Sequence, residues 1–490
     1  MSKINVQTIE DEAVIAERER RQYVKMTKMP IARLIIGLGI PTTLSMMVTS
    51  LYNLADTYFV SLLGDDAVTA AASNLLALMS IIQAIGFTFG MGSGSIISRL
   101  LGKRERERAD VVFSSSLFIS CMCGVGVLVL GFAFFTPMLR LLGAKSADVL
   151  GYSKQYARFI LIAAPFMCMS FVLNNVLRAE GKAVLSMIGL IVGALVNVAL
   201  DPILIFAADM GITGAAVATC VSQVLSFVIL MFMFLSGKTV VRFRLRSISR
   251  KFNVYAEVIS TGFPSFCRQV LASLCTVFLN SAAFDCGRAY YGTEEGGKAA
   301  QAALGVVQKV FMLAFSMSLG IGQGYQPVLG YNYSAKRFDR VKSAYLFTLI
   351  FSMCVMAAFG LICGLCSTYV MQAFSLSPEA IEVGALALRL QCICMPLLPL
   401  NFMASITYQS VGSKAIASLL SVSRQGLFYI PAVLILPTVL GLIGVQSCQA
   451  LSDLLAFFFA IPFTVMFLNT VKKEQMLALE QEKEAEPPLE

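Results

Sequence analysis

Twelve long apolar stretches alternate with short polar connections along the chain. They cover residues 33–60, 67–98, 111–137, 150–177, 184–207, 211–236, 255–286, 299–330, 343–371, 380–410, 415–437 and 441–469. Because a helix needs roughly 20 mostly apolar residues to cross a bilayer, each stretch predicts one spanning helix. The predicted fold class is an all-α polytopic membrane protein with 12 transmembrane helices.

The second half of the chain repeats motifs of the first half in the same order, at offsets of 223 to 233 positions. The pairs are Gly39-Ile-Pro41 with Gly262-Phe-Pro264, Gly90-Met-Gly92-Ser-Gly94 with Gly320-Ile-Gly322-Gln-Gly324, Lys103-Arg104 with Lys336-Arg337, Lys182-Ala183 with Lys414-Ala415, and Gly211-Ile-Thr-Gly214 with Gly441-Leu-Ile-Gly444. Such a repeat indicates a duplicated unit. Since each unit holds six spans, we expect two pseudo-symmetric six-helix bundles, related by an axis along the membrane normal and enclosing a cavity.

Positive charge sorts the connections onto two faces. The face that carries both termini holds 28 of the 38 Lys and Arg residues, and the opposite face holds six, four of them in the loop 138–158. Cytoplasmic connections are enriched in Lys and Arg, so we expect both termini in the cytoplasm. The expected order is a cytoplasmic N-terminal tail (1–30), an N-terminal six-helix bundle (31–237), a cytoplasmic basic linker (238–253), a C-terminal six-helix bundle (254–470) and a cytoplasmic tail (471–490).

Composition excludes several classes of function. Hydrophobic residues make up 57% of the chain and charged residues 14%, which excludes an ordinary water-soluble domain. The placement of the net charge of +9 follows membrane topology rather than a nucleic-acid surface. The chain has no His, and its 13 Cys lie mostly inside apolar stretches. We therefore expect no cofactor, no structural metal site and no enzyme.

Two carboxylates lie deep inside spans of the first half, Asp56 and Asp201. An ionisable group in hydrocarbon costs about 2.5–3.5 kcal/mol and needs a partner, an aqueous cavity or a neutral form. Asn53 shares a helical face with Asp56, and Asn197 shares one with Asp201. Thr219 adds a hydroxyl from the sixth span. These oxygens predict a coupling site for H⁺ or Na⁺; the alternative is that they only bridge helices by hydrogen bonds.

The second half lacks this acidic pattern, because position 201 corresponds to Val433 and position 197 to Tyr429. Coupling chemistry is therefore expected in the first bundle. Polar residues of other spans are candidates to line a substrate cavity, namely Gln223, Arg268, Gln269, Lys309 and Arg424. The alternative for Lys309 or Arg424 is a structural ion pair with Asp453.

Proline and glycine mark the places where helices are expected to bend or approach each other. A proline removes one helical hydrogen bond and clashes with the preceding turn, so Pro41, Pro202 and Pro264 are expected to bend their helices. Pro202 directly follows Asp201, which would leave a free carbonyl near that carboxylate. The glycines of the Gly90–Gly94 motif allow close helix approach, whether for packing or for movement.

Several of these motifs resemble the multidrug and toxic compound extrusion (MATE) family, nearest its bacterial MepA-like branch. The resemblance covers about residues 30–470. It is carried by Gly39-Ile-Pro41 through Asn53-Leu-Ala-Asp56-Thr57, by Leu177-Arg178-Ala-Glu180-Gly181, by Asn197-Val-Ala-Leu-Asp201-Pro202, and by Gly322-Gln-Gly-Tyr-Gln-Pro327 before Gly330-Tyr-Asn332-Tyr.

The resemblance implies a twelve-helix antiporter of the bacterial inner membrane, and we expect the protein to be a monomer. It implies export of cationic or amphipathic organic compounds by alternating access, in exchange for H⁺ or Na⁺, with no nucleic-acid partner. By position, Asp56, Asn197, Asp201 and Thr219 match the cation-binding cluster of the family's first bundle. The chain departs from members that carry acids in the second bundle, because its seventh span holds Arg268 and no mid-span acid.

A flippase for lipid-linked oligosaccharides or their precursors shares this architecture and is the second hypothesis. Convergence of Arg268, Lys309 and Arg424 on one lumen would favour it, because a lipid-linked substrate carries phosphate charge.

Overall fold

The computed structural model describes residues 3–63, 66–144, 146–374 and 377–485, and these residues form helices and connections without any strand. The elements of the first half are α1 (Lys3–Lys28), α2 (Ile31–Ser61), α3 (Asp66–Gly102), α4 (Arg106–Ala133), α5 (Phe135–Leu141), α6 (Ala147–Ala179), α7 (Ala183–Pro202), the π-helical η1 (Ile203–Ala207), α8 (Ile212–Leu235) and the 3₁₀ turn η2 (Leu245–Ser247).

The second half contains the equivalent series. Its elements are α9 (Phe252–Tyr291), α10 (Glu294–Ser334), α11 (Phe338–Leu365), α12 (Ser367–Gln372), α13 (Pro378–Cys394), the 3₁₀ turn η3 (Met395–Leu397), α14 (Leu398–Val411), α15 (Lys414–Val422), the π-helical η4 (Ser423–Tyr429), α16 (Ile430–Leu440) and α17 (Leu442–Ala485). Within the described residues, 12 helical segments are long and apolar enough to cross a membrane. The twelve predicted spans are confirmed.

The backbone shows the duplication directly. Gly211 and Gly441 precede the sixth and twelfth spans with nearly the same conformation, φ 54° and ψ −135° against φ 57° and ψ −132°, a region that glycine adopts readily. Ser146 and Ser377 cap the fourth and tenth spans through the same side-chain hydrogen bond, 3.3 Å in each case. Each half therefore folds by the same local rules.

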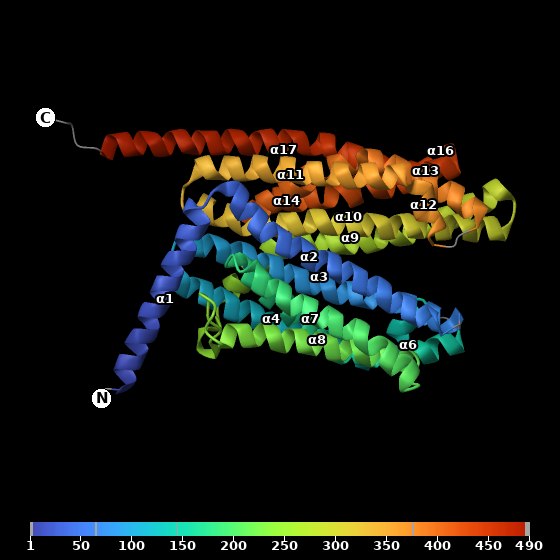
Figure 1. The fold of residues 1–490 in the computed structure, drawn as a ribbon, viewed down its shortest axis with the longest axis horizontal. Coiled ribbons are helices and arrows are strands. Elements are labelled where there is room, and N and C mark those ends of the chain that lie inside the picture. The colour runs from blue at the N-terminus through green and yellow to red at the C-terminus, as the bar shows by residue number, and fades with distance from the viewer. Residues whose placement is uncertain (1–2, 64–65, 145, 375–376, 486–490) are drawn as a thin grey trace.

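The helices form two groups that lie side by side. Figure 1 shows α3 to α8 in the lower group and α9 to α17 in the upper group, with α2 between them. α2 packs along α10 of the other half as well as along α7 of its own, and α3 packs along α9. The bundles therefore meet through their first two helices.

The repeated glycine motifs form this contact. Gly92 of α3 lies against the backbone of Val258 and Gly262 in α9, and Gly324 of α10 lies against the backbone of Gly39 in α2. The Gly262–Pro264 motif therefore contacts the Gly90–Gly94 motif, and the Gly39–Pro41 motif contacts the Gly320–Gly324 motif. Glycine allows this approach because no β-carbon separates the two backbones.

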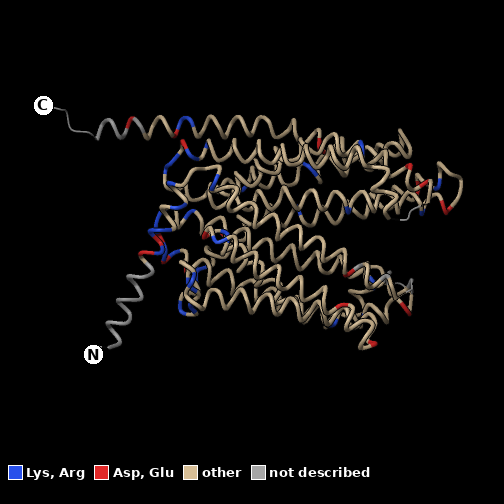
Figure 2. The backbone as a smooth tube through the Cα atoms, viewed as in Figure 1, with Lys and Arg blue, Asp and Glu red and all other residues tan. Residues whose placement is uncertain are grey.

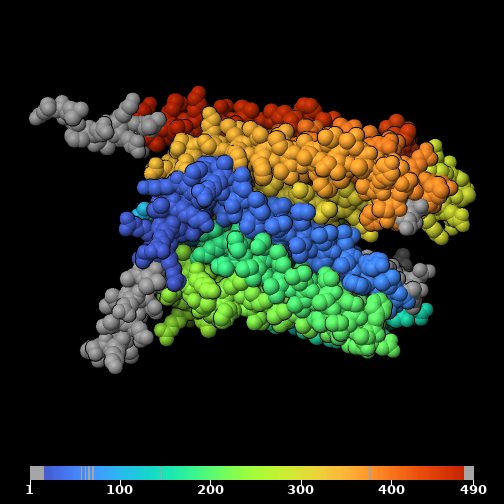
Figure 3. Space-filling view, in the orientation of Figure 1, coloured from blue at the N-terminus to red at the C-terminus, as the bar shows by residue number. Residues whose placement is uncertain are grey.

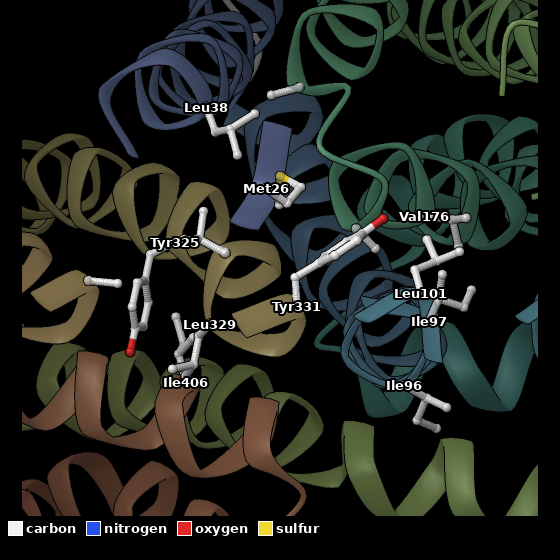
Figure 4. Close-up of a cluster of buried hydrophobic side chains, with 14 of the residues drawn as sticks. Met26, Leu38, Ile96, Ile97, Leu101, Val176, Tyr325, Leu329, Tyr331 and Ile406 are labelled. Carbon is white, nitrogen blue, oxygen red and sulfur yellow. The ribbon is translucent and has the colours of Figure 1, made fainter. Parts of the chain in front are cut away.

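The two bundles are joined near the end of the molecule that holds the termini. The Thr42 hydroxyl donates to the Gly320 carbonyl at 2.6 Å, and the Gln326 amide donates to the Ser95 hydroxyl at 2.5 Å. Buried hydrophobic side chains from both halves form one cluster that includes Leu38, Ile97 and Tyr325 (Figure 4). At the opposite end the space-filling view shows the two groups drawn apart (Figure 3).

Basic residues gather at the joined end, around the last turns of α1 (Figure 2). The expected N-terminal tail contains the helix α1, whose last turns contact both halves. The Met26 carbonyl accepts a hydrogen bond from Asn332 at 3.0 Å, and the Met29 carbonyl accepts one from Arg340 at 2.6 Å. The Arg104 guanidinium of the first half lies 4.3 Å from the centroid of the Tyr23 ring. α1 therefore bridges the two bundles.

The basic linker is held against the first bundle through its backbone. The fully buried Glu180 carboxylate accepts hydrogen bonds from the Val240 and Val241 N–H groups at 3.0 and 2.7 Å and from the Lys182 ammonium at 2.7 Å. Asp110 accepts the Arg242 N–H at 2.8 Å. The linker is thus an ordered strap rather than a flexible connection.

Candidate functional site

The fold brings the two intramembrane acids of the first half together from α2 and α7. Asp201 is fully buried and Asp56 is partly buried. The two carboxylates lie near each other and near the phenols of Tyr52 and Tyr156. The predicted pair of acids therefore forms one cluster, the acid cluster, between α2, α6, α7 and α8.

Hydrogen bonds link five members of the acid cluster in two groups, Tyr156 with Asp56, and Asn197 with Asp201 and Thr219. The Tyr156 hydroxyl donates to Asp56 Oδ2 at 3.3 Å. The Asn197 amide donates to Asp201 Oδ1 at 3.5 Å and to Thr219 Oγ1 at 3.4 Å. All three distances are at the long end for hydrogen bonds, so they leave the oxygens weakly satisfied.

Among the described residues, three buried oxygens of this cluster have no hydrogen-bond donor: Asp56 Oδ1, Asp201 Oδ2 and Asn197 Oδ1. The ion pairs of the described residues include neither acid. A buried carboxylate without a basic partner is stabilised by a proton or by a bound cation. The atoms available to bind a cation are all oxygens, which are the ligands that hard cations prefer. The residues present therefore fit H⁺ or Na⁺.

The remaining first-bundle candidates lie around the acid cluster. Asn53 is partly buried on α2, one turn before Asp56. The Gln223 amide of α8 donates to the Tyr52 hydroxyl at 3.5 Å, so Gln223 borders this cluster rather than the basic residues with which the sequence grouped it. The side chain of Thr57 lies outside the described residues.

The three prolines differ in what surrounds them. Pro202 ends α7, and the chain continues as the π-helical turn η1, so the α-helix is interrupted directly after Asp201. π-Helical turns inside helices are frequent at functional sites. Pro41 and Pro264 lie inside α2 and α9, which continue as α-helices past them.

The second bundle holds a different polar group. Arg424, in η4, donates from Nε to Asp453 Oδ1 of α17 at 2.7 Å, and Gln449 donates to the same oxygen at 3.1 Å. The structural ion pair that the sequence offered as an alternative is therefore present. Arg424 also lies 4.9 Å from the centroid of the Phe311 ring.

Arg424 lines a small pocket inside the second bundle, which we call the arginine pocket. Its walls are Arg268 of α9, Phe315 of α10, Leu398, Asn401, Phe402 and Ser405 of α14, Ser421 of α15, and Arg424 and Gln425 of η4. Two other predicted cavity residues, Gln269 and Lys309, are not among the described residues that line it, and Lys309 is exposed. Of the cavity residues predicted in the second bundle, Arg268 and Arg424 therefore lie in one pocket, and Gln269 and Lys309 do not line it.

Sequence reasoning missed Tyr52 and Tyr156, whose phenols border the acid cluster. A signal existed for Tyr52, which is one position before Asn53 in the motif that carries the resemblance. Tyr156 lies near the start of the fourth span without any acid beside it, and only the hydrogen bond from α6 to Asp56 of α2 shows its place in the cluster.

Comparison with known proteins identifies the family. A family model described as MatE matches residues 41–203 and 292–435, together more than half of the chain. The chain belongs to the MATE family of multidrug efflux transporters.

Curated relatives cover almost the whole chain. The chain is 26% identical over 428 residues to the multidrug export protein MepA of Staphylococcus aureus (strain MSSA476), covering 86% of this chain and 91% of that protein. MepA of Staphylococcus saprophyticus is 24% identical over 462 residues, covering 93% and 99%. The chain is therefore a multi-pass membrane transporter with bacterial relatives.

Solved structures of the family share the fold. A structure titled as the outward-facing conformation of a multidrug resistance MATE transporter matches with a TM-score of 0.85 and 27% identity over 92% of this chain and 98% of that one. A transporter from Pyrococcus furiosus, described as having a binding pocket of reverse polarity, matches with a TM-score of 0.84 and 27% identity over 92% of this chain and 98% of that one. The predicted two-bundle MATE fold is confirmed.

Proposed function

We propose that this MATE transporter exports cationic or amphipathic organic compounds in exchange for H⁺ or Na⁺. The observation that carries the proposal is the acid cluster, where two carboxylates and one amide present buried oxygens without donors. An unsatisfied buried polar group costs about 1–3 kcal/mol, and among the described residues neither carboxylate has a basic partner to offset that cost. A cation that binds and leaves during transport accounts for these oxygens.

The coupling works through the rocking of the two bundles. In the described structure they are joined near the termini, and the acid cluster lies in the first bundle close to α2, which packs against both halves. Binding of a cation between α2 and α7 changes the charge where these helices meet. Coupling follows if cation and organic substrate stabilise different states of the bundles.

Two carboxylates permit more than one charge per cycle. Each pH unit supplies about 1.36 kcal/mol per proton. A second proton exchanged for a monovalent organic cation adds another pH contribution and about 2.3 kcal/mol per 100 mV of membrane potential. Exchange of two protons therefore supports a steeper substrate gradient than electroneutral exchange of one.

The Asp201→Asn variant tests the proposal, because it keeps the shape of the side chain and removes its charge. We expect it to insert and fold as the wild type does, yet to lose ethidium transport in everted vesicles under imposed pH and sodium gradients, each applied alone. Asp285→Asn is the matched control, since Asp285 is exposed on α9 and lies outside the acid cluster. Wild-type transport by Asp201→Asn contradicts the coupling assignment.

The location that goes with this function is the bacterial inner membrane, with both termini in the cytoplasm and the protein acting as a monomer. The gathering of Lys and Arg at the end that holds the termini supports this orientation (Figure 2). Protease treatment of intact and everted vesicles tests it: the 471–490 tail is expected to be cleaved only in everted vesicles.

The flippase alternative receives partial support, since Arg268 and Arg424 meet in one pocket. Asp453 neutralises Arg424, and Lys309 lies elsewhere, so the pocket offers less positive charge than a phosphate-linked lipid requires. Reconstituted protein that translocates a fluorescent polyprenyl phosphate faster than protein-free vesicles would favour the flippase.

A further inference from the structure

The arginine pocket contains a guanidinium that lacks a counter-charge. Arg268 forms no ion pair within the described residues, and its Nη1 atom is buried without a hydrogen-bond partner. Its neighbour is the Phe402 ring, whose centroid lies 5.3 Å away. An unpaired arginine buried among apolar helices is costly, so the site favours an anion.

The second arginine of the pocket, Arg424, forms an ion pair but still has an N–H group without a hydrogen-bond partner. Arg424 is 8% exposed, and its Nη2 atom has no hydrogen-bond partner although Nε is bonded to Asp453. Asp453 balances the charge of Arg424, so the positive charge of Arg268 remains. The pocket thus carries one net positive charge and at least two free N–H groups among its described walls.

The remaining walls define what else the ligand contacts. Phe315 and Phe402 supply aromatic faces, while Asn401, Ser405 and Gln425 supply polar atoms. The Gln425 Oε1 atom is itself buried without a donor. Aromatic rings beside guanidinium groups suit a planar ligand whose charged edge faces the arginines.

We propose that the arginine pocket binds the carboxylate of an aromatic substrate. One carboxylate balances the one uncompensated positive charge, and its two oxygens match the free N–H groups of Arg268 and Arg424. Because the pocket is small and Phe402 is buried, the pocket receives the carboxylate while the ring of the ligand lies against the partly exposed Phe315. The proposal rests on the proposed export function and extends its substrates to aromatic anions and zwitterions.

Binding of 2-naphthoate to the purified transporter in lipid nanodiscs tests the proposal. The chain has no Trp, so the fluorescence of the naphthyl group is measured against little protein background. The uncharged 2-naphthamide has the same ring and is the matched ligand. We expect wild-type protein to bind 2-naphthoate at least tenfold more tightly than 2-naphthamide. Equal binding of the two overturns the proposal without any variant.

Variants assign the preference to Arg268. Arg268→Gln is expected to weaken 2-naphthoate binding at least tenfold and to leave 2-naphthamide binding unchanged, with partial recovery in Arg268→Lys. Arg389→Gln is the control, because Arg389 is exposed and bonded to Ser367 and Thr368 instead. Unchanged 2-naphthoate binding by Arg268→Gln overturns the proposal.

Two further measurements distinguish this proposal from a phosphate site and from the proposed coupling site. Tighter binding of 2-naphthyl phosphate than of 2-naphthoate overturns the assignment of a carboxylate and points to a phosphate ligand. Asp201→Asn is expected to retain 2-naphthoate binding while it loses cation-driven export. Failure of the coupling site and failure of the anion site therefore give different results.

Discussion

Gly262 in α9 lies so close to the Thr88 carbonyl in α3 that a β-carbon at position 262 would overlap it. These residues belong to different bundles, and their contact lies in the region where the bundles are joined. The contact exists only while that end of the molecule is closed. Its strength therefore contributes to the balance between the states of the transport cycle.

Substitution at this contact is expected to shift that balance. Gly262→Ala places a methyl group against a backbone carbonyl, and overpacking of this kind costs about 1–3 kcal/mol. The cost applies only when the bundles are joined near the termini, so the population of that state falls by roughly 5–150-fold. Electron paramagnetic resonance between spin-labelled noncanonical residues at positions 103 and 337, which are exposed on opposite bundles, measures the shift.

Gly305→Ala is the control for this prediction, because nothing lies within 4 Å of a β-carbon built at Gly305. It is expected to leave the distance distribution unchanged. The same distribution for Gly262→Ala and the wild type would show that the contact does not influence the equilibrium.

The Arg424–Asp453 pair leads to a prediction about stability. Removing one partner of a buried ion pair costs about 3–5 kcal/mol, whereas replacing both by apolar residues is often neutral or stabilising. Asp453→Asn is therefore expected to lower the thermal unfolding midpoint in detergent, and Arg424→Met combined with Asp453→Leu is expected to recover it. Circular dichroism measures both midpoints. A double variant as unstable as Asp453→Asn contradicts this account of the pair.

Glu180 gives a prediction about the linker. Its carboxylate is the acceptor for two linker N–H groups and for Lys182, and hydrogen bonds to charged groups contribute about 1.5–3 kcal/mol each. Glu180→Ala removes all three and is expected to expose the linker to trypsin at Arg242, Arg244 and Arg246. Cleavage should be several times faster than in the wild type, as followed by mass spectrometry.

The comparison for this experiment is Glu257→Gln, since the Glu257 side chain is 48% exposed and lies 3.9 Å from Arg99. Its cleavage rate at the linker should equal that of the wild type. Equal rates for Glu180→Ala would mean that other contacts hold the strap, such as the bond from the Arg242 N–H to Asp110.

Sequence patterns predicted the fold well because a bilayer imposes a length and a polarity on each helix. The twelve spans and the duplication follow from apolar length and from motifs such as Gly211 and Gly441, whose backbone conformations are nearly equal. Details that depend on packing between distant segments were not predictable. The helix α1 has few apolar residues, and its bridging contacts to Asn332 and Arg340 depend on how the bundles lie.

For the candidate site too, features set by local sequence were predictable, and features set by packing between distant segments were not. Asp56 and Asp201 were conspicuous because carboxylates are rare in apolar helices, and Asn197 and Thr219 followed from helical spacing. The sequence did not predict which polar residues of the second bundle lie together. The spacing of residues along one helix does not show which residues of another helix they contact. Arg268 and Arg424 share a pocket, whereas Lys309 lies elsewhere on α10.

The contacts of α1 with both halves offer a way to measure conformational change during transport. Its carbonyls at Met26 and Met29 are bonded to the second half, while Tyr23 meets Arg104 of the first half. When the halves separate, one of these attachments must release. A dye on the exposed side of this helix would therefore brighten or dim once per turnover, and the protein would report its own cycling without a labelled drug.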